Sequence, residues 1–190
     1  MRGNRRWIPR LGTFTVIAAA LVAMTAVPAA AKTVPPDEYA DAACSEIVDW
    51  AEGLNAASQD FDAAEGPSEA ADALEGAVDD TTALMKQLRK VGTPDVEGGK
   101  ASARAFIVPF KDGRDLLRDA AADAADLPDD ADGFDEGKTE IDTALDEGFT
   151  ALGPEIDAVE ADADPELRDA LQADSSCNEV FGNEAASDGS

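Results

Sequence analysis

The chain has 190 residues, with 15 lysines and arginines against 41 aspartates and glutamates, and a formal net charge of −26 at pH 7. Histidine is absent and there are two cysteines, which excludes Ser/His and Cys/His nucleophile pairs and the usual zinc sites. The size suits one domain. The negative charge makes nucleic acid and anionic lipid poor partners and a cationic macromolecule a better one.

Residues 1–31 have the pattern of a signal peptide. Four arginines precede an apolar stretch over 11–27, and small residues end at Ala31, where we expect cleavage. A retained membrane anchor is the alternative, but threonines and Pro28 interrupt the stretch. Cleavage leaves an extracellular or wall-associated protein with no membrane insertion. The choice between general secretory and twin-arginine export stays open.

Residues 32–190 keep 11 basic residues against 41 acidic ones, a formal charge of −30. The acidic residues are spread along the chain rather than grouped in blocks. Such a surface keeps the chain soluble, and it also fits adaptation to a salty exterior, where counterions screen the self-repulsion.

Apolar residues recur every seven positions in the first part of this domain. The spacing of Ala40, Ile47, Leu54 and Phe61 predicts a helix over about 36–62. A similar pattern predicts a second helix over about 68–91, ended by Gly92. Lysines and arginines in its last turn suit the negative helix end.

Thr93 and Pro94 have the residue types of a helix N-cap and first helical position, so a third helix is expected to start there. Its apolar stripe continues to Leu127, and Pro109 is expected to kink it near Ala105. The residues 127–133 form a turn.

A fourth helix is predicted from about Asp135 to Val159, and Gly153-Pro154 either kinks or restarts it. A last, shorter helix carries Leu167 and Cys177, and no strand pattern appears. The predicted fold is all-α, an up-down antiparallel four-helix bundle with a fifth C-terminal helix over 32–182. The tail 183–190 is expected to be disordered.

Cys44 and Cys177 each lie on the apolar side of their helix. An exported protein with an even cysteine count favours a structural disulfide, and two free buried thiols are the alternative. In the predicted bundle the last helix starts at the end where the first begins. The two cysteines then lie roughly 12 and 18 Å from that end, close enough for a small shift to join them.

Two sets of residues are weak candidates for ligand binding. The first is an acidic turn with an Asp-x-Asp-Gly pattern, in which Asp130, Asp132, Asp135 and Glu136 are candidate metal ligands. Its first and twelfth calcium-loop positions hold no carboxylate, so at most weak binding is expected, and an ordinary acidic turn is the alternative. The second is the kink, where Phe106, Pro109 and Phe110 are candidates to line an apolar groove, although such prolines more often only bend a helix.

An early cysteine, "LMKQLRKVGTPD" at 84–95 and a late cysteine resemble uncharacterised small secreted helical proteins of high-GC Gram-positive (actinobacterial) type. The resemblance implies a compartment and an architecture, and no activity. The chain has no phosphate loop or nucleophile elbow and calls for no cofactor, so we do not expect an enzyme. The predicted function is a secreted acidic bundle with a binding or structural role in the cell envelope or exterior, its partner unknown. A low-affinity binder of divalent cations such as calcium is the alternative.

Overall fold

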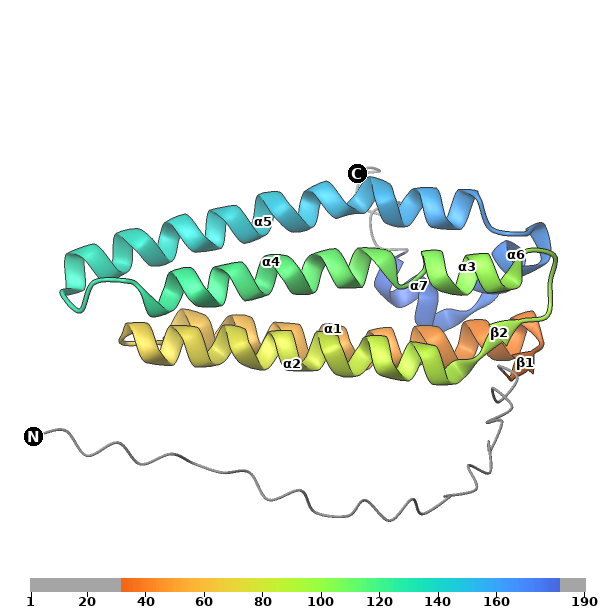
Figure 1. The fold of residues 1–190 in the computed structure, drawn as a ribbon, viewed down its shortest axis with the longest axis horizontal. Coiled ribbons are helices and arrows are strands. Elements are labelled where there is room, and N and C mark those ends of the chain that lie inside the picture. Colours follow the sequence, from red (N-terminus) through yellow and green to blue (C-terminus); the bar gives the residue numbers. More distant parts are fainter. Residues whose placement is uncertain (1–31, 182–190) are drawn as a thin grey trace, which may run out of the picture. The chain divides into compact units, whose positions relative to one another are not determined.

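A computed structural model describes residues 32–181, and these are almost entirely helical, which confirms the all-α prediction (Figure 1). The predicted signal peptide and the tail 183–190 lie outside the described residues. In chain order the elements are β1 Thr33–Val34, α1 Pro36–Ala63, α2 Pro67–Val91, β2 Thr93–Pro94, α3 Gly99–Ala105, α4 Val108–Ala125, α5 Ala131–Ala161, α6 Pro165–Ala173 and α7 Ser175–Phe181.

Prolines and glycines mark several helix boundaries. Pro36, Pro67 and Pro165 occupy first helical positions, where a missing N–H costs nothing and the fixed φ suits the helix. Gly92 follows α2 with φ 114°, a conformation that favours glycine, and a Cβ there would collide with the carbonyl of Lys32. The first two helices therefore have nearly the predicted bounds.

The prediction for residues 93 and 94 was wrong. Thr93–Pro94 is β2, which pairs in parallel with β1, and the next helix begins only at Gly99. The backbone amide of Thr93 donates to the carbonyl oxygen of Lys32 at 2.8 Å. The prediction that no strand forms was wrong for the same reason, because a two-residue pair has no alternation to detect.

The break between α3 and α4 lies where the kink was predicted. α3 ends at Ala105, residues 106 and 107 form a turn, and Pro109 falls in the first turn of α4. By contrast, α5 runs through Pro154 without restarting. The predicted last helix is two helices, α6 and α7, separated at Asp174.

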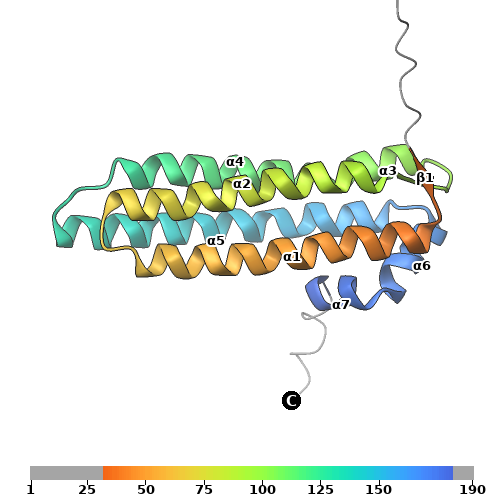
Figure 2. The ribbon, with the colours of Figure 1, turned by 90° about the horizontal axis from the view of Figure 1, so that it is seen from below.

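Helix packing follows the order of the chain. α1 packs on α2, α2 on α4 and α4 on α5, while α6 and α7 pack on α1 (Figures 1 and 2). The C-terminal helices therefore lie against the first half of α1 (Figure 2). From Asp142 to Val159, α5 contributes no buried side chain.

The buried apolar residues form two clusters. Cluster 1 joins the first half of α1, the end of α2 and the C-terminal helices, and it contains Val34, Tyr39, Ala40, Ala43, Cys44, Ile47, Leu84, Met85, Leu88, Phe110, Ala163, Leu167, Leu171 and Cys177. Cluster 2 fills the other half of the molecule, and it contains Phe61, Ala64, Ala70, Ala71, Leu74, Ala77, Leu117, Ala120, Ala121, Ala124, Phe134 and Ile141. Among the described helices, none is long and apolar enough to cross a membrane.

Candidate functional site

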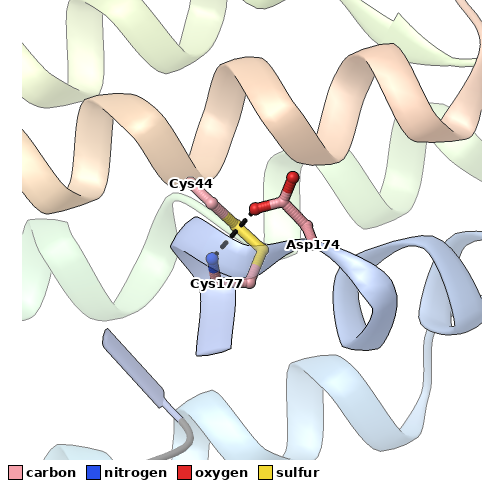
Figure 3. Close-up of side chains that lie close together, drawn as sticks. All are labelled: Cys44, Asp174 and Cys177. Carbon is pink, nitrogen blue, oxygen red and sulfur yellow. Dashed lines mark hydrogen bonds between the residues drawn. A yellow bond between two sulfur atoms is a disulfide. The ribbon is translucent and has the colours of Figure 1, made fainter. Parts of the chain in front are cut away.

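The two cysteines form a disulfide between α1 and α7, as predicted (Figure 3). Their Cα atoms are 5.0 Å apart across a sequence separation of 133 residues. Cys44 is 0 % exposed and Cys177 is 4 % exposed, and both belong to cluster 1. The bond therefore lies inside an apolar contact between the first and last described helices.

Asp174 positions the second cysteine. Its Oδ1 accepts hydrogen bonds from the backbone amides of Ser176 at 2.9 Å and Cys177 at 3.0 Å, which caps the start of α7. The carboxylate and the two sulfurs lie within 4.8 Å of one another, and among the described residues they are the group of three ligand atoms that could hold a metal. Both sulfurs are bonded to each other, however, so the oxidised protein offers only the carboxylate.

Removing this cap gives a first testable prediction. Asp174→Ala is expected to lower the free energy of unfolding by about 1 kcal/mol, because two amides at the start of α7 lose their acceptor. Asp174→Asn is the matched control, since an asparagine side chain also caps well and should leave stability near that of the wild type. Urea unfolding of the oxidised proteins measures both. Equal losses in the two variants would mean that the charge, rather than the cap, matters.

The candidate groove residues lie among aromatic rings. Phe106 packs edge-on against Tyr39 at 6.4 Å and against Phe110 at 6.3 Å between ring centroids, and Phe110 packs on Trp50 at 5.2 Å. Pro109 and Phe110 are buried. These residues therefore fill space between α1 and α4 in the structure, and a ligand there stays a prediction.

Three side chains with polar groups, Trp50, Thr81 and Tyr39, belong to this aromatic region. The indole Nε1 of Trp50 donates to Thr81 Oγ1 at 3.0 Å, and Thr81 donates in turn to the carbonyl of Ala77 at 2.7 Å. Burial raises the pKa of Tyr39 to about 12. The only indole of the described residues is thus a partly buried side chain that packs against cluster 1 and has a satisfied N–H, which suits packing better than sugar stacking.

The candidate metal ligands are not brought together. Asp130 accepts from the backbone amide of Gly133 at 3.0 Å, while Asp132, Asp135 and Glu136 lie on the first turns of α5. All four side chains are exposed. Their oxygens do not form a group of three within 4.8 Å of one another. Asp130 therefore stabilises the first turn of α5, and cation binding at this turn stays a prediction.

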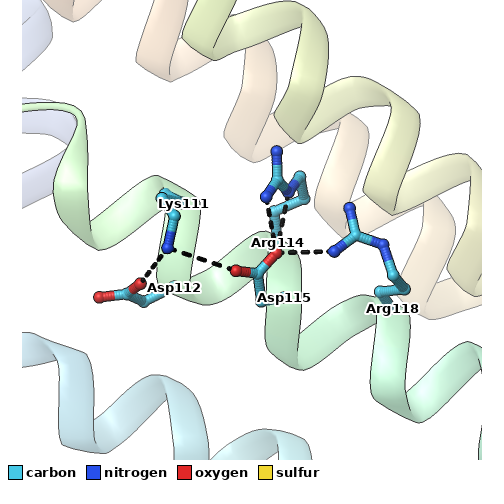
Figure 4. Close-up of polar contacts among 5 residues, drawn as sticks. All are labelled: Lys111, Asp112, Arg114, Asp115 and Arg118. Atoms are coloured by element: carbon cyan, nitrogen blue, oxygen red, sulfur yellow. Dashed lines mark hydrogen bonds and ion pairs between the residues drawn. The ribbon is translucent and has the colours of Figure 1, made fainter.

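An ion-pair cluster occupies the surface of α4 (Figure 4). Asp115 Oδ1 accepts from Arg114 at 2.6 Å and from Arg118 at 2.7 Å, and Lys111 lies 3.5 Å from the other oxygen. Hydrogen bonds from Arg114, and then from Arg118, lower the pKa of Asp115 to about 2. Because the cluster is exposed, its ion pairs hold side chains together on the surface of α4 and do not contribute to the core.

The pKa of Asp115 is a second testable prediction. An NMR titration of its carboxyl carbon in low salt should give a midpoint near 2, and Arg114→Gln should raise the pKa toward about 3.9. A lowered pKa means that the carboxylate stabilises the fold fully above about pH 3.9 and loses this effect as the pH falls toward 2. Arg89→Gln, on another helix, is the control and should leave the midpoint unchanged.

Lys138 is a structural residue that the sequence did not reveal. Its Nζ donates to the carbonyl of Asp62 at 2.6 Å and reaches that of Ala64 at 3.4 Å, near the end of α1. The same group lies 5.7 Å from the ring centre of Phe61 and 5.6 Å from that of Phe134. A lysine from α5 therefore satisfies carbonyls at the end of α1, a long-range contact with no local signal.

Comparison with known proteins gives no match: no family model fits the sequence, and no curated protein or solved structure is detectably similar to the chain. The function must therefore be argued from the residues themselves.

Proposed function

We propose that the chain is an exported, acidic, non-enzymatic protein with a binding or structural role in the cell envelope or exterior. The observation that carries this proposal is the buried Cys44–Cys177 disulfide, which joins the two ends of the described chain. Such bonds persist in oxidising compartments outside the cytosol. The arginines and apolar stretch of residues 1–31 support the same compartment.

The chemistry of the described residues supports a non-enzymatic role. The chain has no histidine, and both thiols are consumed by the disulfide. Carboxylates remain, but none whose side chain the structure describes is buried, so burial does not tune a carboxylate toward acid–base catalysis. A binding or structural role requires only that the charged side chains are exposed.

For the finer topology we propose an up-down arrangement of α1, α2, the α3–α4 pair and α5, with α6 and α7 laid on α1. Short connections between successive helices support it, as do the contacts of α1 with α2, α2 with α4 and α4 with α5. The disulfide then fixes the C-terminal helices on the side of α1 that α2 leaves open.

The test is to express the full chain with a C-terminal tag in a high-GC Gram-positive host and to fractionate the cells. We expect the protein outside the cytosol, beginning at Lys32, with no thiol that can be alkylated. Crosslinking on intact cells should then capture the partner. Leu21→Arg, which interrupts the apolar stretch, is the control and should stay in the cytosol. A wild-type protein found in the cytosol with two free thiols would contradict the proposal.

A further inference from the structure

A carboxylate lies directly beside the Cys44–Cys177 disulfide (Figure 3). One oxygen of Asp174 and the two sulfurs all lie within 4.8 Å of one another. Asp174 is the single residue between α6 and α7, three positions before Cys177, so the start of α7 carries the carboxylate and the cysteine together. Both ends of the sulfur–sulfur bond are therefore close to the same negative charge.

Backbone amides hold this carboxylate in place. Its Oδ1 accepts from the amides of Ser176 at 2.9 Å and of Cys177 at 3.0 Å. A cysteine in the first turn of a helix usually has its thiolate stabilised by the free amides of that turn. Here Asp174 already accepts from two of those amides. The first turn of α7 therefore offers a thiolate on Cys177 little of the usual stabilisation.

No cation offsets the charge of Asp174 among the residues whose side chains the structure describes. The acidic partners in the ion pairs of this part of the chain are Asp112 and Asp115, both on α4. Asp174 is partly buried, so solvent and salt screen its charge less than that of an exposed carboxylate. The two sulfurs therefore lie in a negative local potential.

Reduction of a disulfide passes through states in which its sulfurs carry negative charge. A thiolate attacks one cysteine sulfur and bonds to it, the sulfur–sulfur bond breaks, and the other cysteine leaves as a thiolate. The second sulfur of a dithiol reductant then displaces the first cysteine. The two cysteine thiolates take up the two protons that the reductant lost, and the reductant becomes a disulfide.

The position of Asp174 makes the first of these steps unfavourable whichever sulfur is attacked. Negative charge is shared by the attacking, the attacked and the leaving sulfur, and both cysteine sulfurs lie close to the carboxylate. Repulsion between like charges at this distance raises the barrier. The reduced protein at pH 7, in contrast, holds neutral thiols, because an ordinary cysteine ionises near pH 8.5. The carboxylate therefore acts on the rate of reduction and much less on its equilibrium.

We propose that Asp174 protects the Cys44–Cys177 disulfide kinetically against exchange with external thiols. Burial of both cysteines limits contact with a reductant, and the carboxylate repels the thiolates that do reach the bond. Asp174 thus has a role beyond capping α7. The inference goes beyond the proposed function and concerns the bond itself, in whatever compartment the protein works.

The experiment follows reduction of the full-length oxidised chain by dithiothreitol at pH 7 in low salt, with samples quenched by an alkylating mass tag. D174N removes the charge and keeps a capping side chain. We expect D174N to be reduced about tenfold faster than wild type, and the difference to shrink in molar salt. The equilibrium with dithiothreitol at pH 7 should stay within about twofold of that of wild type.

A second measurement keeps the test independent of any change in stability. Wild type and D174N are each reduced with cysteamine, which is cationic, and with mercaptoethanesulfonate, which is anionic. The ratio of the cysteamine rate to the mercaptoethanesulfonate rate should be at least about threefold larger in wild type, because only wild type has the carboxylate beside the bond. A looser α7 would speed both reagents alike and leave this ratio unchanged.

D164N is the matched control. Asp164 caps α6 by accepting from the amide of Glu166 at 2.9 Å, and it lies one nine-residue helix before Asp174, about 15 Å away. The variant makes the same change in net charge and should be reduced at the wild-type rate. Equal acceleration in D164N and D174N would overturn the proposal, because net charge would then govern the rate. An unchanged rate and reagent ratio in D174N would also overturn it, since exchange would then occur only after α7 has left α1. Neither failure would alter the fractionation result on export.

Discussion

Replacing both cysteines with alanine is expected to lower the free energy of unfolding by about 2–5 kcal/mol. The bond joins α1 to α7 across a sequence separation of 133 residues, so its loss greatly enlarges the unfolded ensemble. Both side chains are buried in cluster 1, so the double alanine variant C44A/C177A avoids leaving an unpaired thiol there. Chemical denaturation of the variant and the oxidised wild type measures the difference.

Without the disulfide, we expect α6 and α7 to unfold locally before the rest of the domain unfolds. α6 and α7 make their helix contacts mainly with α1 and with each other, so the disulfide is the covalent part of a small interface. In C44A/C177A we expect trypsin to cut after Arg168 while the circular dichroism of the longer helices is retained. Wild type treated with a dithiol reductant should be cut at the same place. Unchanged stability and resistance to cleavage after reduction would contradict a stabilising role for the bond.

The long helices could be predicted from the sequence because each keeps one apolar stripe over many turns. Ile47 and Phe61 are buried on the same helix, as their fourteen-residue spacing requires. The break before α4 could also be predicted, since Pro109 cannot donate to the preceding turn. In these places the local signal and the tertiary packing agree.

The sequence failed where a long-range contact decided the local structure. Thr93 and Pro94 have the residue types of a helix start, but pairing with Thr33 and Val34 holds them extended. Asp174 divides the last predicted helix because its side chain caps the amides that follow it. Lys138 reaches the end of α1 from α5, which no local pattern announces.

The candidate site could be predicted only in part for a related reason. The Cys44–Cys177 disulfide was predictable from the expected export and the cysteine count, because two cysteines allow one pairing. The acidic turn, in contrast, was chosen by residue type alone, and its four carboxylates do not come together in the structure.

Phe110→Ala should be the most damaging single substitution in the aromatic region, lowering the free energy of unfolding by about 3–5 kcal/mol. Phe110 is 6 % exposed and packs edge-on against both Trp50 and Phe106, so its removal leaves a cavity where α4 meets α1. Urea unfolding measures the loss, and the emission of Trp50 should change because the indole loses its ring contact. Val108→Ala, two residues away and 49 % exposed, is the matched control and should cost less than about 1 kcal/mol. Equal losses in the two variants would mean that the start of α4 is held by its backbone rather than by the aromatic contacts that join it to α1.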